Sequence, residues 1–314
     1  MCDANLPLLK KIVQDFGCNP IDQDPTKLYS SGFHGITSII NDESLSSLTG
    51  VTFSIFSFLL NVLPNMESSK MNKQTKLLIT LMKLKTGLSY SALAILFNIH
   101  RTSVQRTFVT TLQCLNVLLK NFIFWPSETT IKATLPEAFK KHYPDTRVII
   151  DCTEVNTEIP PQVKERVLMY SEYKHHHTVK FLVRCTPNGF VSFVSKCYGG
   201  RAGDCFITND CGIIDLIEPG NLVMADKGFP TIRTQVENKN AVFVMPPFLR
   251  NPQFSAEEVE ETYNITSVRI HIERIMQRIK DFNIFCKVPV SLLPYIDEIV
   301  FVVCALINLE IIQE

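Results

Sequence analysis

The pattern of hydrophobic and polar positions divides this chain into a helical first part and a second part in which strands and helices alternate. In the first part, apolar residues recur at helical spacing over residues 76–85 and 90–97, and Ser89 can cap the second of these helices. A short break then precedes a third expected helix, which Thr102 or Ser103 can cap. Two helices joined by so tight a break fit a helix-turn-helix.

The second part contains five short apolar runs that we expect to be strands. Expected helices separate the later runs, and the order is three strands, a helix, a strand, a helix, a strand and a helix. This order predicts an α/β domain with a mixed five-stranded sheet flanked by helices. The expected strands lie at residues 147–151, 177–185, 190–197, 221–226 and 241–245, and the expected helices lie at residues 204–217, from residue 231 onward and around residue 273.

Length and composition agree with a soluble globular protein of more than one domain. The chain has 314 residues, of which 46% are hydrophobic and 20% are charged, and its formal net charge is zero. We expect a first region of unknown role at residues 1–65, a helix-turn-helix module at 66–127 and an α/β domain at 128–314. The ten cysteines contain no C-x-x-C pair, which favours free thiols in a reducing compartment.

Charge is distributed unevenly along this neutral chain. Residues 68–127 contain no Asp or Glu but several Lys and Arg residues, beginning at Lys70 and ending at Lys120. A cationic module on a neutral chain is typical of a segment that contacts DNA, although an ordinary helical bundle with a solvated basic face explains the same pattern equally well. The side chains with the reach to contact phosphates or base edges are Arg101, Ser103, Gln105 and Arg106.

Neither end of the chain carries a pattern that indicates a membrane protein. The first residues lack the basic-then-apolar order of a signal peptide. The apolar stretch at residues 299–312 is preceded by Glu298 and contains Glu310, and it is too short to cross a bilayer. We therefore expect a buried helix there and no membrane partner.

Three acidic residues are the candidates for catalysis. Asp151 ends the first apolar run, Asp226 ends the fourth, and Glu273 lies in a later basic helix. Taken singly, an Asp at a strand end is common and a helical Glu beside Arg is usually a surface ion pair. Taken together, the three carboxylates can converge at one edge of an α/β sheet and hold two divalent metal ions for phosphodiester chemistry.

The helix around Glu273 carries cations as well. Arg269 precedes Glu273 by four residues and Lys280 follows it by seven, so all three lie near one face of the helix. A carboxylate between cations suits a metal ion held beside a DNA phosphate. The alternative is an ordinary i,i+4 ion pair between Arg269 and Glu273 that stabilises the helix, and this pair would not require Lys280.

Other polar residues in the second part are expected to have structural roles. We expect Glu154 to be exposed to solvent after the strand end rather than to be an accessory acid. Zinc binding by His175, His176 and His177 is not expected, because consecutive strand residues point to alternate faces.

Separated motifs give the chain a resemblance to a known family. They occur in the order Ile150-Asp151-Cys-Thr-Glu154, Tyr170-Ser171, His176 to Lys180, Tyr198 to Asp204, Ala225 to Phe229 and Ile272-Glu-Arg274. They resemble the DDE transposase domain of the PIF/Harbinger superfamily, most of all animal members that follow a THAP zinc finger. Residues 1–49 contain no THAP pattern. The helix-turn-helix is similar to the one that precedes the nuclease in the same proteins.

The resemblance also implies roles for individual residues. Asp151, Asp226 and Glu273 would be the catalytic triad of an RNase H-like nuclease and would bind Mg²⁺ or Mn²⁺. Arg269, Glu273 and Lys280 fit the spacing of the Tyr-Arg-Glu-Lys signature of related bacterial transposases, although Thr266 stands where that signature has Tyr. Asp204 would have a structural role as the cap of the helix that follows it. Lys227 and Gly228, just after Asp226, would form a tight turn and contact a phosphate.

The implied activity is that of a nuclear DNA transposase. Such an enzyme cleaves double-stranded DNA at transposon ends and transfers the freed 3′ hydroxyl to target DNA. One alternative is a domesticated protein that binds DNA or another partner without nuclease activity, and another is a nuclease-free protein that carries a sister protein to the nucleus. The oligomeric state, including a homo-oligomer, stays open.

Overall fold

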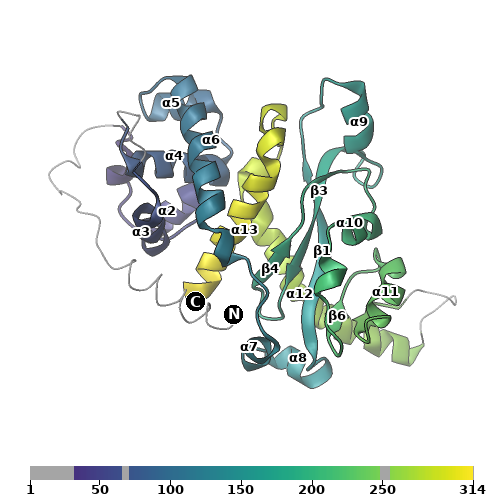
Figure 1. Ribbon diagram of the computed structural model, residues 1–314. Coiled ribbons are helices and arrows are strands. Elements are labelled where there is room, and N and C mark those ends of the chain that lie inside the picture. The colour runs from purple at the N-terminus through teal and green to yellow at the C-terminus, as the bar shows by residue number, and fades with distance from the viewer. Residues whose placement is uncertain (1–31, 66–70, 248–254, 314) are drawn as a thin grey trace. The chain divides into compact units, whose positions relative to one another are not determined.

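The structure is a computed structural model, and it describes residues 32–65, 71–247 and 255–313 (Figure 1). Residues 1–31 of the expected first region, and Lys70, lie outside these residues. The described residues group into two compact units. One contains those up to Phe122 and from Ile279 onward, and the other contains those from Ile123 to Arg278. The domain limits expected from the sequence stay predictions.

The first unit is built from helices. Residues 76–85 and 90–97 were expected to be helical, and both expectations are confirmed. The α-helices of this unit are α2 (Asp42–Thr49), α3 (Phe53–Val62), α4 (Lys73–Thr86), α5 (Tyr90–Leu96), α6 (Arg101–Leu118) and α13 (Ile296–Gln313), and the 3-10 helices lie at Gly35–Ser38, Lys120–Phe122, Asn283–Phe285 and Val290–Tyr295.

Helices α5 and α6 form the tight pair that the sequence predicts. The Ser89 hydroxyl accepts a hydrogen bond from the Ala92 N–H at 3.1 Å, so Ser89 caps α5 as expected. The cap of α6 was predicted wrongly, because α6 begins at Arg101 and its N-cap is His100. The imidazole Nδ1 of His100 accepts from the Thr102 N–H at 3.3 Å, which a search for Ser or Thr caps overlooks.

Helix α13 is buried along most of its length, as expected. Its Asn308 side chain donates a hydrogen bond to the Phe122 carbonyl at 2.7 Å. The expectation that this segment is too short to span a bilayer does not hold by length, because the turn before α13 extends the helical segment to Val290–Gln313. Length and composition alone would let this segment cross a membrane, but buried core helices of soluble proteins pass the same test.

The second unit is built around a mixed sheet, which confirms the expected α/β, RNase H-like architecture. The strand order is β2-β3-β1-β6-β7, and β4 and β5 also pair with β3. Strand β1 runs antiparallel to β3 and parallel to β6, and β6 runs parallel to β7. The strands are β1 (Thr146–Asn156), β2 (Tyr170–Ser171), β3 (His176–Cys185), β4 (Val191–Val194), β5 (Tyr198–Gly199), β6 (Leu222–Met224) and β7 (Val242–Val244).

The helices of the second unit depart from the expectation in two places. The helix expected over residues 204–217 ends at Asp210, because Gly212 adopts a φ of 73° and a 3-10 turn follows at Ile213–Leu216. The connection between β1 and β3 contains α9 and β2, which the sequence pattern did not predict. The α-helices are α7 (Glu128–Ala133), α8 (Glu137–His142), α9 (Val163–Met169), α10 (Asp204–Asp210), α11 (Arg233–Glu237) and α12 (Ala256–Lys280).

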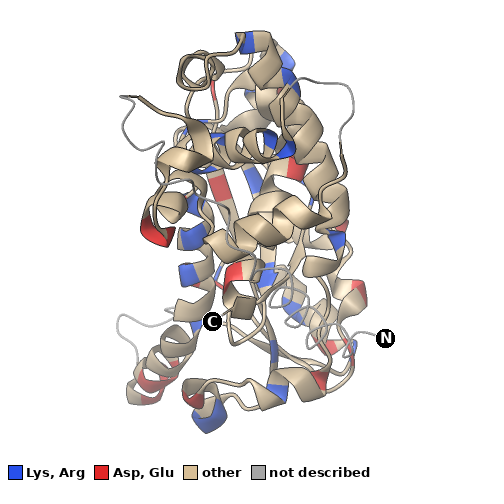
Figure 2. Ribbon diagram, turned by 90° about the vertical axis from the view of Figure 1, so that its left-hand side faces the viewer, with Lys and Arg blue, Asp and Glu red and all other residues tan. Residues whose placement is uncertain are grey.

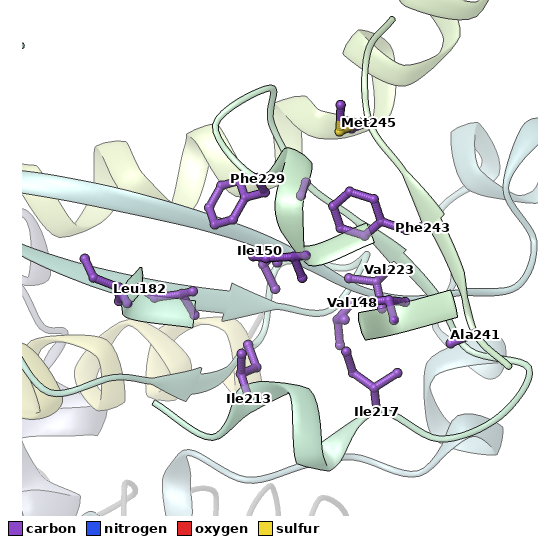
Figure 3. Packing of buried hydrophobic residues seen from close by; sticks show 14 residues of the cluster. Val148, Ile150, Leu182, Ile213, Ile217, Val223, Phe229, Ala241, Phe243 and Met245 are labelled. Carbon is purple, nitrogen blue, oxygen red and sulfur yellow. The ribbon is translucent and has the colours of Figure 1, made fainter. Parts of the chain in front are cut away.

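One face of the sheet packs against α10, α11 and the segments beside them (Figure 3). Val148 and Ile150 of β1 bury their side chains in this cluster together with Phe229. Each such side chain contributes roughly 1.5–3 kcal/mol to the free energy of unfolding. Because side chains alternate along a strand, the burial of Val148 and Ile150 on this face directs Ile149 and Asp151 to the other face.

Candidate active site

Asp151 and Asp226 occupy equivalent positions on neighbouring parallel strands. The pairing of β1 with β6 ends at the partners Ile149 and Met224, and each aspartate follows two residues later. Asp151 is not at the end of its strand, as the apolar run suggested, because β1 continues to Asn156. The polar residues beyond Asp151 stay in the strand because β3 still pairs with them, Asp151 itself lying opposite Val183.

Asp226 is held by groups on both sides of it. Its Oδ1 accepts hydrogen bonds from the Lys227 N–H at 2.7 Å and from the Arg269 guanidinium at 3.1 Å. Arg269 comes from α12, and its side chain is 10% exposed, whereas that of Asp226 is 47% exposed. The ion pair therefore connects α12 with the turn after β6 and leaves part of the Asp226 carboxylate open to solvent.

The surroundings of Asp151 disfavour the charged form of its carboxyl group. Burial is the largest cause that raises its pKa, and the negative charges of Asp226 and Asp204 add to it; against the opposing positive charge of Arg269, the pKa of Asp151 rises to about 6. The Cys152 N–H donates to Asp151 Oδ1 at 2.8 Å and also favours the charged form. Asp151 and Asp226 thus repel each other across a site that Arg269 neutralises only in part.

Glu273 forms no metal-binding group with this pair of aspartates among the described residues. It follows Arg269 by one helical turn on α12, and its side chain is exposed. In residues 32–65, 71–247 and 255–313, no three His, Cys, Asp or Glu side chains are grouped so that they could hold one ion. The structure therefore brings Asp151, Asp226 and Arg269 together, and the metal-binding and catalytic roles of the three acidic residues stay predictions.

The chemistry of the two aspartates nevertheless fits a hard divalent cation. Mg²⁺ and Mn²⁺ prefer carboxylate oxygens, and Asp151 and Asp226 supply them from adjacent strands. A cation would also relieve the repulsion that raises the pKa of Asp151.

Glu154 departs from the expectation of a solvent-exposed residue. It lies inside β1, and its side chain is 7% exposed. Its carboxylate contacts the ammonium of Lys180 at 3.0 Å and accepts a hydrogen bond from the Thr178 hydroxyl at 2.8 Å. The expectation was wrong because it assumed that the strand ends at Asp151.

Lys180 joins Glu154 to Asp204, a contact that the sequence did not predict. Its ammonium lies 3.1 Å from Asp204 Oδ1. Asp204 was expected to cap α10, but the N-cap is Gly203 and the Asp204 side chain turns to Lys180 instead. The one available signal was a lysine within the apolar strand that runs from His176 to Cys185.

The helix-turn-helix exposes the polar residues that the sequence singled out. Arg101, Ser103, Gln105 and Arg106 are all exposed in the first turns of α6. They are accessible to DNA, and their binding role stays a prediction.

The basic segment as a whole is not one cationic surface, which corrects the interpretation of its charge pattern. Lys76 and Lys83 of α4 are buried. The Lys83 ammonium donates to the Leu88 carbonyl at 2.7 Å, just beyond the end of the helix. Lysines near a helix C-terminus bind its free carbonyls and interact favourably with its dipole, so a basic residue in the sequence need not face a phosphate.

Helix α12 changes in charge along its length (Figure 2). Its first turn carries Glu257 and Glu258, whereas Arg, His and Lys residues follow Arg269. Of the two predicted DNA contacts on this helix, Lys280 is exposed and Arg269 is buried in its ion pair with Asp226. Both contacts stay predictions.

The free thiols expected from the sequence are confirmed for the described cysteines, whereas the expectation that the histidine run does not bind zinc stays a prediction. His176 is exposed and His177 is half-buried, and the described residues form no metal-binding group around them. All the cysteines that the structure describes are free, with Cys185 and Cys304 buried.

Comparisons with known proteins agree with this geometry. Residues 69–121, which include α4, α5 and α6, match the family described as helix-turn-helix of DDE superfamily endonuclease. Residues 150–308 match the family described as DDE superfamily endonuclease. The search of curated proteins found no match. The longer match begins one residue before Asp151 and includes Asp226 and Glu273, and the chain belongs to the DDE superfamily endonuclease family.

Proposed function

We propose that this protein is a metal-dependent DNA transposase that cleaves phosphodiester bonds at transposon ends and transfers the 3′ hydroxyl to target DNA. The observation that carries the proposal is the equivalent placement of Asp151 and Asp226 beyond the last paired residues of β1 and β6. Arg269 contacts Asp226 there and acts electrostatically on Asp151. Two carboxylates beside a guanidinium suit the phosphodiester chemistry of the DDE superfamily endonuclease family.

Asp151 and Asp226 would hold Mg²⁺ or Mn²⁺, and Glu273 is the proposed third ligand. When bound, such a cation supplies charge stabilisation at the phosphate and lowers the pKa of a water molecule. The protein orients its own carboxylates for this task. Cys152 N–H holds one oxygen of Asp151, and Arg269 with Lys227 N–H holds one oxygen of Asp226, so each carboxylate keeps a second oxygen for the cation.

Double-stranded DNA is the proposed partner of the helix-turn-helix. Arg101 and Arg106 are exposed at the start of α6, the part of a recognition helix that enters the major groove. Ser103 and Gln105 lie between them and add hydrogen-bonding groups. A nuclear location follows from this substrate and is part of the proposal.

Membership of the PIF/Harbinger superfamily is the finer assignment that we propose. Its support is the ordered set of motifs around Asp151, Asp204, Asp226 and Glu273, together with the spacing of Arg269, Glu273 and Lys280. A THAP-associated origin is proposed on the same motifs.

The decisive experiment measures Mg²⁺- or Mn²⁺-dependent DNA cleavage by variants of the two aspartates. Asp151→Asn and Asp226→Asn are each expected to lower the rate by about 10³-fold, since several kcal/mol of transition-state stabilisation depend on the cation. DNA binding should persist in both. Asp215→Asn is the matched control, because Asp215 is an exposed aspartate of the 3-10 turn at Ile213–Leu216. Full cleavage by both active-site variants would refute the assignment.

One observation favours a second candidate, a domesticated DNA-binding protein without nuclease activity. Glu273 is exposed and is not grouped with Asp151 and Asp226 among the described residues. A purified wild-type chain that binds DNA but neither cleaves it nor binds Mn²⁺ would support this candidate.

A further inference from the structure

The turn that carries Asp226 is in contact with a second polar network, formed by Glu154, Lys180 and Asp204. Lys180 and Glu154 are direct cross-strand partners on β3 and β1. The Lys180 ammonium lies 3.0 Å from Glu154 and 3.1 Å from Asp204, and its side chain is 13% exposed. One buried cation therefore ties the central strand to the first turn of α10.

This network is separated from Asp151 by the pleat of β1. Asp151 and Glu154 are three residues apart in the strand, so their side chains point to opposite faces of the sheet. Glu154 shares its face with Val148 and Ile150, the face that packs against α10. The Lys180 network therefore lies on the opposite face of β1 from the Asp151 side chain. The charge of Asp204 acts on Asp151, and the network contacts the site at the Asp226 turn.

Gly228 is where the network contacts the Asp226 turn. A Cβ atom placed on Gly228 would lie 2.6 Å from Asp204 Oδ2, so any side chain at position 228 requires the Asp204 carboxylate to move. The Cys205 thiol, next to Asp204, also donates to the Gly228 carbonyl at 3.4 Å. Asp204 and Cys205 of α10 therefore support the turn from one side, while Arg269 of α12 holds Asp226 from the other.

We propose that Lys180 is a positioning residue for metal binding: by fixing Asp204 against Gly228, it sets the place of the Asp226 carboxylate relative to Asp151. The inference rests on the proposed function, because it assigns a supporting residue to the same site. Without the Lys180 ammonium, Asp204 loses its ion pair, and its side chain, already 28% exposed, turns to solvent. The Asp226 turn then loses its support at Gly228.

The first experiment compares Mn²⁺ affinity, measured by calorimetry on the folded full chain, in Lys180→Met and the wild type. Replacing a residue that orients a metal ligand typically weakens metal binding by about 10–100-fold, so Lys180→Met is expected to weaken Mn²⁺ binding by at least about 10-fold. Lys180→Arg keeps a cation between the two carboxylates and should recover most of the affinity. Ser195→Ala is the control for lost stability alone, because it removes a buried hydrogen bond to Leu182 on the same sheet. Its Mn²⁺ affinity should be unchanged.

The second experiment disturbs the same contact without touching the ion pair residues. In Gly228→Ala, the new methyl group would meet Asp204 Oδ2, so the Asp204 side chain, whose Oδ1 contacts Lys180, has to shift. This variant should weaken Mn²⁺ binding about as much as Lys180→Met does, and the double variant should bind no worse than either single variant, because both changes break one contact.

The outcomes separate this inference from the proposed function. A wild-type chain that binds no Mn²⁺ refutes the metal site itself. A wild-type chain that binds Mn²⁺ while Lys180→Met and Gly228→Ala bind it equally well overturns only the positioning role. Additive losses in the double variant overturn the shared contact at Gly228.

Discussion

Two buried lysines, one in each compact unit, show that the same residue type can have opposite roles in this molecule. The Lys83 ammonium of α4 donates to the carbonyls of Gly87 and Leu88 and lies 5.2 Å from the centre of the Tyr90 ring, and burial lowers its pKa. Lys180 of β3 lies between two carboxylates, which raise its pKa against the effect of burial. Lys83 closes a helix, whereas Lys180 compensates charge beside the candidate active site.

The difference teaches how to interpret basic residues in the two regions. In the helical unit, a high density of Lys and Arg did not mean a continuous surface for DNA, because some lysines serve their own backbone. In the sheet unit, an isolated cation in an apolar strand indicated buried carboxylates nearby. The effect of replacing a buried lysine on the free energy of unfolding therefore depends on whether its partner is a carbonyl or a carboxylate.

The largest effect on stability is expected from Lys180→Met. Removing the cation leaves the buried Glu154 carboxylate and Asp204 without their ion pair, which should lower the free energy of unfolding by about 3 kcal/mol. Lys83→Met loses hydrogen bonds to carbonyls and the contact with the Tyr90 ring, but no ion pair with a carboxylate, and should cost about 1 kcal/mol. Denaturant unfolding of both variants measures the two changes in the free energy of unfolding. Equal changes would show that the two lysines do not differ in this way.

The next effect concerns Asp151 and its dependence on pH. Because the pKa of Asp151 rises from 3.8 to about 6 on folding, the folded state binds this proton more tightly than the unfolded state. Stability contributed by the group is therefore present below pH 4 and is lost as the pH rises to about 6. Asp151→Asn should be more stable than the wild type by up to about 3 kcal/mol at pH 7.5 without metal, and this gain should vanish near pH 4.

Unfolding curves at several pH values in the presence of a chelator test this prediction. Asp215→Asn, an exposed change in the same unit, serves as the control and should show no such dependence. If the free energies of unfolding of Asp151→Asn and the wild type differ by the same amount at all pH values, the pKa of Asp151 is not raised on folding.

A smaller effect is expected for DNA binding by the helical unit. Arg101→Ala combined with Arg106→Ala should weaken binding about 10-fold and reduce the slope of log affinity against log salt by about 2, if each exposed arginine contacts one phosphate as proposed. Lys83→Met should leave both quantities unchanged, because Lys83 is buried. Fluorescence anisotropy at several salt concentrations gives both values, and an unchanged slope in the arginine variant would remove α6 from the interface.

The smallest effect is expected at the cap of α5. Ser89→Ala removes the hydrogen bond from the Ala92 N–H and should lower the free energy of unfolding by about 1 kcal/mol. Ser89→Asp should retain most of the stability, because aspartate caps helices equally well. Thermal unfolding of the two variants makes the test, and an equal loss in both would exclude capping as the role of Ser89.

The sequence predicted those features that depend on neighbours along the chain. Gly87 and Ser89 mark the end of α4 and the start of α5, and the apolar runs before Asp151 and Asp226 locate β1 and β6. Helical spacing likewise located α12 around Glu273. Local propensity and burial pattern decide such features.

The features that the sequence did not predict depend on contacts across the fold. The extension of β1 to Asn156 requires β3 as a partner, and the burial of Glu154 requires Lys180. The contact of Asp204 with Gly228 joins α10 to a turn far along the chain. Helix α9 is short and exposes Val163 and Val167, so no amphipathic pattern marks it.

The two aspartates of the candidate site also differ in how firmly the backbone beneath them is anchored. Asp151 sits within a strand whose amides are hydrogen-bonded along its length, whereas Asp226 follows the end of a three-residue strand and leads into a turn. Local opening costs least where ladder bonds are few. Amide hydrogen exchange should accordingly be slow around Asp151 and faster in the segment after Met224, so that the two carboxylates differ in how freely their backbone opens.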